Sequence, residues 1–293
     1  MEERILNEWT DLDIEYLKNN FCNHTKKELA TALGRTENAI QLKANRIGLK
    51  REDKYFYRKD YFNEITTADQ AYWLGFLYAD GCVSKEKGKS STYTVAIQLS
   101  IRDIDHLRNF NRDIYGNVGI TTKHVDTMYN GKRVHGDTCL IRLYCSKMAL
   151  DLISHGCCVN KSLIKDKPVG VPDKYMWDFI RGYFDGNGSF SHSYNKKNDK
   201  TYRRISIETG SKLFSEWLSK YLNDNDIKNN CYPDGKNAFK IQVSASKSVS
   251  KFLECIYNDA HRYLVRKYHD YLDAVCEDGT ILTNYHGAKS VKA

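Results

Sequence analysis

The sequence has no long apolar run. It holds no stretch of about eighteen apolar residues, the length that a helix needs to span a bilayer. Its first residues, MEERILNEWTDLD, carry charges where a secretory signal peptide needs an apolar segment. We therefore expect no membrane segment and a soluble, cytoplasmic protein.

Cysteine pairs of the CxxC type are also missing. The nine cysteines are odd in number and mostly interrupt apolar runs, as reduced thiols in a core do. His155, Cys157 and Cys158 lie close in sequence, but the absence of a second ligand pair argues against a zinc site. The cysteines are therefore predicted to be packed in the core.

Positive charge is in modest excess. The chain carries 45 Lys and Arg against 37 Asp and Glu, a formal net charge of +8, together with 21 tyrosines. Such a balance suits a partner with many phosphates, but many soluble proteins of this size share it. The hydrophobic share of 41% is sufficient for a packed core, so composition indicates a folded protein and leaves the partner open.

Three short helices are predicted over residues 9–21, 25–34 and 35–50, because apolar residues recur in each at helical spacing. Gly34 stands where the turn after the second helix needs a positive φ, and Thr36 can cap the third helix. The segment resembles Myb-like and GcrA-like helix-turn-helix domains. Residues 1–52 are therefore predicted to bind DNA, and residues 53–69 to form a linker along the DNA backbone. The alternative is a protein-interaction module. The residues able to contact bases or phosphates from the third helix are Asn38, Gln41, Lys43, Asn45 and Arg46.

An internal repeat occupies the rest of the chain. When Gly75 is aligned with Gly182, the segments 71–84 and 177–191 share one pattern: aromatic, apolar, Gly, aromatic, apolar, any residue, small, Asp or Asn, Gly. Strand, helix, strand and helix patterns follow in the same order in both copies. The predicted fold is therefore α+β, a pseudo-twofold pair of αββαββα units with antiparallel sheets. The units span residues 70–160 and 161–278, and a tail follows at 279–293.

The segments WLGFLYADG and IRGYFDGNG resemble the two motifs of the monomeric LAGLIDADG homing endonucleases, and the resemblance extends from about residue 70 to about residue 260. It implies a monomer that hydrolyses double-stranded DNA at a long target, pseudo-palindromic or asymmetric, during intron homing. It also implies Mg²⁺ as the cofactor, with Ca²⁺ or Mn²⁺ able to substitute in the site.

Small residues recur on one face of both motif helices. Only Gly or Ala lets two helix backbones approach closely, so these residues are predicted to pack the motif helices together. Paired helices in any dimer-like core could use them in the same way. They are Gly75 and Ala79 in the first copy and Gly182 and Gly186 in the second.

Asp80 is expected to lie at the C-terminal end of its helix, just before Gly81, where the helix dipole repels an anion. We therefore expect a cation to balance its charge. The resemblance implies that this residue binds a divalent metal beside the scissile phosphate. Asn187 occupies the same place in the second motif and can coordinate a cation without adding charge, which lowers the affinity for Mg²⁺. Three explanations are open: an engineered change, a natural nicking or slow enzyme, or a DNA-binding regulator. Asp185 lies roughly 200° from Asn187 around the helix and is predicted to point away.

Further catalytic candidates occupy equivalent positions in the two units. Gln98 and Glu208 occupy the same strand position in the two units. The second unit therefore lacks a carboxylate in its motif, at Asn187, but has an additional one on this strand, at Glu208. Coincidence is the alternative explanation. The resemblance implies that this position helps to hold the nucleophilic water. Lys147 and Lys247 follow the last strand of each unit, where the family often has a basic residue that offsets phosphate charge. Surface lysines at a helix start are the alternative.

Strand alternation predicts a DNA-reading face on each sheet, with every second residue toward the major groove. A basic loop between the first two strands of each unit, at 84–91 and 193–204, is predicted to grip phosphates, unless it is only a solvated hairpin tip. The residues predicted to contact DNA here are Lys85, Lys87, Lys89, Thr92, Thr94, Lys196, Lys197, Arg203 and Arg204.

Three functions remain open at this level. The leading hypothesis is a Mg²⁺-dependent, site-specific DNA endonuclease, and the alternative is a cleavage-inactive relative that acts as a DNA-binding regulator. An RNA-binding maturase is the third, although a helix-turn-helix domain fits the major groove of B-form DNA and not the deep, narrow groove of RNA.

Overall fold

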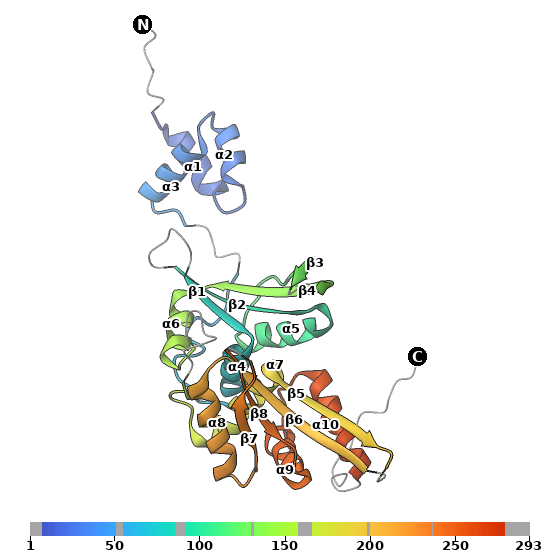
Figure 1. The fold of residues 1–293 in the computed structure, drawn as a ribbon. Helices are drawn as coiled ribbons and strands as arrows, with labels where there is room; N and C mark the ends of the chain where they lie inside the picture. The colour runs from blue at the N-terminus through green and yellow to red at the C-terminus, as the bar shows by residue number, and fades with distance from the viewer. Residues whose placement is uncertain are drawn as a thin grey trace. The chain divides into compact units, whose positions relative to one another are not determined.

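The computed structural model describes residues 8–50, 55–85, 92–129, 132–157, 166–197, 200–235 and 237–278. Contacts within the chain divide it into two compact units, Met1–Phe56 and Tyr57–Ala293. Figure 1 shows that the first unit is helical and that both sheets belong to the second. Among the described residues, no helix has the length and apolar character needed to cross a membrane.

The first unit is a three-helix fold with its own core. Its helices are α1 (Asp11–Asn20), α2 (Lys26–Ala32) and α3 (Glu37–Arg46). Each begins after a threonine whose hydroxyl accepts a backbone N–H from the first helical turn, and Gly34 adopts φ +60° between α2 and α3. The buried side chains are Leu17, Phe21, Leu29, Ala30, Ile40 and Ala44.

The second unit contains two halves with the same order of elements. The first half consists of α4 (Ala68–Ala79), β1 (Gly81–Lys85), β2 (Tyr93–Ser100), η1 (Ile101–Asp103), α5 (Ile104–Asp113), β3 (Thr121–Tyr129), β4 (Lys132–Tyr144) and α6 (Ser146–Ser154). The second consists of η2 (Asp173–Tyr175), α7 (Met176–Asn187), β5 (Gly188–Asn195), β6 (Lys200–Thr209), α8 (Lys212–Asp224), β7 (Asn230–Pro233), β8 (Phe239–Val243) and α9 (Ser246–Tyr257), followed by α10 (Val265–Asp278).

The two four-stranded antiparallel sheets are built alike. Their strand orders are β1-β2-β4-β3 and β5-β6-β8-β7. Gly81 pairs with Ile97 in the first sheet, and Gly188 pairs with Ile207 in the second, at the same point of each motif. The mixed α+β fold with two antiparallel sheets is therefore as predicted from the repeat.

The two halves differ in two elements. The β3–β4 ribbon continues through the pairs from His124–Asp137 to Tyr129–Lys132, beyond the last pairing of β2 with β4 at Ser100 and Thr138. Its counterpart, β7 with β8, has only four pairs. In the second half, α10 follows the repeat, and the sequence pattern did not predict it as a separate helix.

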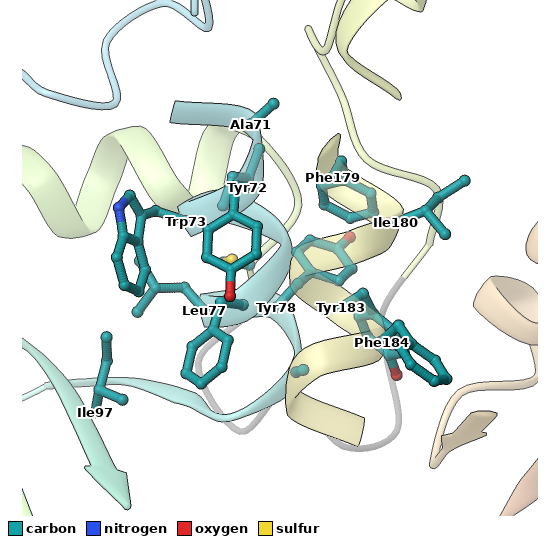
Figure 2. Packing of buried hydrophobic residues seen from close by; sticks show 14 of the residues in the cluster. Ala71, Tyr72, Trp73, Leu77, Tyr78, Ile97, Phe179, Ile180, Tyr183 and Phe184 are labelled. Atoms are coloured by element: carbon teal, nitrogen blue, oxygen red, sulfur yellow. The ribbon is translucent and has the colours of Figure 1, made fainter. Parts of the chain in front are cut away.

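The core of the second unit surrounds α4 and α7. Figure 1 shows these two helices between the sheets, and Figure 2 shows them side by side with their aromatic side chains around the contact. Tyr72 and Trp73 from α4, and Phe179 and Phe184 from α7, are each at most 1% exposed. Burial of such large apolar rings is the main stabilising contribution expected for a core of this kind.

The segment before α4 was expected to be a linker and is instead part of this core. Tyr61, Phe62 and Ile65 are at most 4% exposed. The Gln70 side chain donates to the carbonyl of Tyr61 at 2.6 Å, and the Arg58 N–H donates to the Ile114 carbonyl at 2.8 Å. The aromatic and branched residues of this segment bury more surface against α4 than a solvated linker would, so the linker prediction is wrong from Tyr57 onward.

The cysteine prediction is correct in part. Cys139, Cys145 and Cys157 are buried free thiols, whereas Cys22 and Cys82 are exposed free thiols. Cys82 lies on the open side of β1, where alternation turns it away from the core.

Candidate active site at the paired motif helices

The backbones of α4 and α7 are in direct contact. A Cβ atom built on Gly75 would lie 2.0 Å from the Phe179 carbonyl oxygen, and one built on Gly182 would lie 2.0 Å from the Tyr72 carbonyl oxygen. No larger residue fits at either position without separating the helices, because the clashing atoms belong to the backbone.

The other two predicted interface residues, Ala79 and Gly186, also meet in this contact. A Cβ on Gly186 would lie 2.3 Å from the Cβ of Ala79. The space between the helices therefore holds one methyl group at this level and not two.

This packing brings the ends of both motifs together. Asp80 is the C-cap of α4, and Asn187 is the last residue of α7. The same Cβ position on Gly186 is 3.5 Å from the Asp80 amide nitrogen, so the backbone of the residue before Asn187 lies close to that of Asp80. Two helix C-termini with their partial negative charge thus converge on one region, which favours a bound cation.

Tyr183 lies beneath this region and links it to the second sheet. Its hydroxyl donates to the Glu208 carbonyl at 3.2 Å, and the Asn187 side-chain amide donates to the same hydroxyl at 3.4 Å. Burial, with a smaller contribution from the negative charge of Asp80, raises the pKa of Tyr183 to about 12. Tyr183 therefore remains a neutral phenol that positions Asn187 against β6.

Lys267 is a functional candidate that the sequence patterns missed. From α10, its ammonium donates to the carbonyls of Phe184 and Gly188, at 2.6 Å each, on either side of Asn187. The side chain is buried, and this burial lowers the pKa of Lys267 to about 8, although the carboxylate of Asp185 offsets part of the effect. A cation is therefore already present at the end of α7.

The role of Lys267 was not predicted because this residue lies outside the matched repeat. It belongs to a tyrosine-rich helix whose sequence pattern is typical of an amphipathic helix that packs on a core. The available signal was the basic pair Arg266 and Lys267 at the start of that helix. A basic pair of this kind is common on protein surfaces, so the sequence alone does not distinguish it.

Asp185 anchors the chain that leads to Lys267. Its buried carboxylate accepts hydrogen bonds from the hydroxyls of Tyr72 and Tyr257, at 2.7 and 2.6 Å, and from the Leu264 amide at 2.7 Å. Burial raises the pKa of this carboxyl. Its partners lie in the core and not at Asn187, in agreement with the predicted direction of the side chain.

The same segment ties the second half to the first. The Arg262 guanidinium donates to Asp113 at 2.8 Å, and Asp113 also accepts from the indole N–H of Trp73 at 2.7 Å. Arg266 donates to Asp103 at 3.2 Å. Residues 262–267, which we call the strap, therefore form hydrogen bonds with both halves and place Lys267 at the end of α7.

Gln98 and Glu208 occupy equivalent strand positions, as the repeat predicts, but their surroundings differ. Gln98 pairs across the sheet with Leu140, whereas Glu208 pairs with Lys240. The Glu208 carboxylate lies 3.2 Å from the Lys240 ammonium, which also binds Asp234 at 2.6 Å. The carboxylate of Glu208 is therefore paired with Lys240, a residue that the sequence patterns did not identify as a candidate.

Lys147 and Lys247 are each the second residue of a helix, α6 and α9. Lys147 donates to the Asn63 side chain at 2.8 Å and forms an ion pair with Asp151 in its own helix. Lys247 is exposed. Their equivalence is as expected, but the ammonium that contacts the end of a motif helix is that of Lys267.

The residues predicted to read DNA from the sheets fall into different environments. Thr94 is only 6% exposed and shares a hydrogen bond of 2.8 Å with Ser84, its cross-strand neighbour on β1. The Thr94 side chain is therefore not accessible to a DNA groove, and the prediction that it contacts DNA is wrong. Thr92 is half-buried beside it, Lys85 is exposed, and Lys87 and Lys89 lie outside the described residues.

In the second sheet, Arg203 and Arg204 point to opposite faces. Ile205 is fully buried, so alternation places Arg203 on the helix-covered face, at its edge, and Arg204 on the open face. Both residues, together with Tyr202, line a polar depression of about 250 Å³. The remaining two predicted contacts, Lys196 and Lys197, are exposed between β5 and β6.

The predicted contacts of the first unit also separate. Asn38, Asn45 and Arg46 are exposed on α3, and Gln41 is half-buried, with its amide donating to Asn45 at 2.8 Å. The Lys43 ammonium instead lies over the Trp9 ring, 5.5 Å from its centroid. Lys43 therefore packs at the edge of the unit's core.

A family model matches part of the chain. Residues 175–257 match the LAGLIDADG-like domain. The matched segment runs from η2 to the end of α9 and includes Asp185, Asn187 and Glu208, while the strap lies beyond it. The second half of this unit thus contains a match to the LAGLIDADG-like domain, and the first half repeats the order of elements and the strand register of this half.

Solved structures with partly similar backbones are also found, with TM-scores below 0.5. They include the LAGLIDADG homing endonuclease I-GzeII in complex with a DNA target, at 15% identity and a TM-score of 0.46 over 73% of this chain and 93% of that one. The meganuclease I-AabMI bound to uncleaved DNA gives 17% identity and 0.47 over 72% and 92%. The endonuclease I-SmaMI bound to uncleaved DNA with calcium ions gives 13% and 0.46 over 73% and 93%. A comparison with curated proteins found no significant match.

Proposed function

We propose that this chain is a site-specific endonuclease of double-stranded DNA, of the LAGLIDADG homing type. The observation that carries the proposal is the close pairing of α4 and α7 at Gly75 and Gly182, which brings Asp80 and Asn187 together. Two antiparallel sheets flank this pair and offer a surface for each half of a DNA site. The helix-turn-helix unit is proposed to bind the same DNA, and the active form is proposed to be a monomer.

The proposed cofactor is Mg²⁺, and the donor set suits a cation that shares its ligands with DNA. Within the described part of the chain, no three His, Cys, Asp or Glu side chains group closely enough to hold a metal alone. Mg²⁺ is commonly bound by one or two carboxylates, waters and substrate phosphates, which fits Asp80 with the amide oxygen of Asn187. Bound there, a divalent cation would supply Lewis-acid stabilisation of negative charge on the scissile phosphate.

The residues of the chain have distinct proposed roles. Asp80 provides the one carboxylate at the helix ends, and Asn187 provides a neutral oxygen donor. Lys267 places a positive charge beside Asn187, where it offsets charge that develops on the phosphate. Asp185 holds the strap in place and does not contact the reacting atoms.

Because Asp80 provides a carboxylate and Asn187 does not, the two motif sites are expected to cut unequally. The test uses a supercoiled plasmid that contains a duplex selected by the protein from a random library, incubated with Mg²⁺. We expect the natural chain to nick, Asn187→Asp to yield linear product, and Asp80→Asn to give neither. Gel-shift assays in Ca²⁺ verify that all three proteins still bind.

If neither the natural chain nor Asn187→Asp cuts a duplex that both bind, the endonuclease proposal fails and a DNA-binding regulator remains. If the chain prefers intron RNA to the selected duplex, the maturase hypothesis replaces both.

A further inference from the structure

The solvent-facing side of α3 combines amides with one exposed leucine. Asn38, Gln41, Leu42 and Asn45 follow the i, i+3, i+4, i+7 spacing that places residues on one side of a helix. Ile40 and Ala44 are 0% exposed and define the opposite side, against the core of the unit. Leu42 is 60% exposed, so it contributes little to that core.

The chemistry of this side matches one kind of base pair. An Asn or Gln amide can bond both the acceptor N7 and the donor N6 of adenine, and an apolar side chain can contact the methyl group of thymine. Guanine is most often read by Arg or Lys, which donate to its two acceptors. On α3, Arg46 flanks the amides at the end of the helix, and Lys43 is turned toward Trp9.

The charge of the first unit also argues against binding by phosphate attraction alone. Residues 1–56 contain ten Lys and Arg and ten Asp and Glu, so the net charge of +8 lies entirely in residues 57–293. A unit without net charge gains little from nonspecific attraction to DNA, and its affinity must come from contacts to the bases.

We propose that this side of α3 reads an A·T-rich segment of the target through the major groove, with the amides on adenine edges and Leu42 on thymine methyl groups. The inference rests on the proposed DNA-binding function and adds to it the class of sequence that the first unit selects. Leu42 is then a specificity-determining residue.

The test uses the full chain and a library of random duplexes. Selected sites are compared between the natural chain and the variants Leu42→Ala, Asn38→Ala and Leu12→Ala. Leu12 is the matched control, because it is also an exposed leucine, at 78% against 60% for Leu42, and lies on α1 of the same unit. Thymines in the selected segment are then replaced by uracil, which removes only the methyl groups.

We expect an A·T-rich segment that the natural chain and Leu12→Ala both select. Uracil should weaken their binding by about fourfold for each buried methyl group, the size of the hydrophobic contribution of one such group. Leu42→Ala should bind thymine and uracil duplexes equally, and Asn38→Ala should lose about fivefold or more at one adenine position.

Three results would overturn the inference. The first is a G·C-rich segment, the second is an equal uracil effect in Leu42→Ala and the natural chain, and the third is unchanged site selection in Leu42→Ala and Asn38→Ala. The last result would assign this side of α3 to a partner other than DNA. A chain that binds no duplex at all would instead refute the proposed function, which separates the two failures.

Discussion

At the scale of single residues, a lysine from outside the repeat lies at the end of the second motif, where Asn187 replaces the carboxylate that Asp80 provides in the first. Asn187 is flanked by the two carbonyls that Lys267 binds. A buried ammonium is costly unless its protons are bonded, and these carbonyls at a helix end are well suited to bond it. The protonation of Lys267 should therefore be visible in the stability of the fold.

We predict that the stability of the natural chain relative to Lys267→Met rises between pH 8 and pH 9.5. The folded-state pKa of Lys267 is about 8, below its ordinary value of 10.5. In this window the unfolded chain binds more protons than the folded chain, so the free energy of unfolding increases with pH. Urea unfolding at several pH values measures the difference, with Lys247→Met as a control for loss of an exposed lysine.

Equal pH dependence of the natural chain, Lys267→Met and Lys247→Met would show that Lys267 is not protonated and buried as described. The comparison with a variant is needed because tyrosines with raised pKa values act in the opposite direction at higher pH.

Asp185 is predicted to affect one strand of the DNA only. It holds the Leu264 amide, three residues before Lys267, so Asp185→Asn should misplace the ammonium beside Asn187 and leave Asp80 unchanged. In the Asn187→Asp background, cleavage of one strand should slow by about tenfold or more, as expected when a charged group near the phosphate moves.

Strand-resolved gels with each DNA end labelled separately measure this effect. A general loss of folding would slow both strands equally, and that outcome would assign Asp185 a structural role only. Tyr257→Phe removes one bond to the same carboxylate and should show a weaker form of the same bias.

At the scale of elements, the contact between α4 and α7 accommodates one methyl group at the level of Ala79 and Gly186. Gly186→Ala would place two Cβ atoms 2.3 Å apart, so we predict a loss of about 1–3 kcal/mol of stability from overpacking. The exchange variant Ala79→Gly with Gly186→Ala keeps one methyl group in the contact and should recover most of this loss. The effects on helix propensity nearly cancel in the exchange.

Thermal and urea unfolding of both single variants and the exchange variant form a double-mutant cycle. Additive effects, without recovery in the exchange variant, would contradict the one-methyl contact.

Elements with a strong local pattern could be predicted from the sequence. The glycines and the Asp80 and Asn187 positions recur in both copies, so the paired helices, the succession of helices and strands along each half and the equivalence of Gln98 and Glu208 followed from the repeat. The helical spacing of apolar residues, Gly34 and the cap at Thr36 likewise marked the three helices of the first unit.

Features that depend on contacts between distant segments could not be predicted. The sequence around Tyr61 and Phe62 is compatible with a linker or with part of a core. These side chains are buried because α4 packs against them, and their own sequence does not report this contact. Lys267 reaches the motif because Asp113, Asp103 and Asp185 hold the strap, and no local pattern reports those bonds. Thr94 is in contact with Ser84 of another strand, and its own strand pattern does not report that contact.

At the scale of the whole molecule, the distribution of charge separates two modes of DNA binding. The second unit carries the entire positive excess, and its exposed Lys196 and Arg204 lie on or beside the second sheet. Phosphate contacts release counterions and make affinity fall with salt, whereas base contacts of amides and apolar groups do so far less. The two units should therefore contribute differently to the salt dependence.

We predict that a chain of residues 57–293 binds the selected site more weakly than the full chain, but with a similar dependence on salt. This segment keeps its whole hydrophobic core, which begins at Tyr61, so it is expected to fold. The slope of log affinity against log salt should fall by no more than about one or two, the effect of one or two lost phosphate contacts. Lys196→Gln in the full chain is the matched control and should lower the slope by about one with little change of sequence preference. A slope that falls by half or more on removing residues 1–56 would mean that the first unit grips phosphates despite its zero net charge, and the base-reading role of α3 would then lose its electrostatic support.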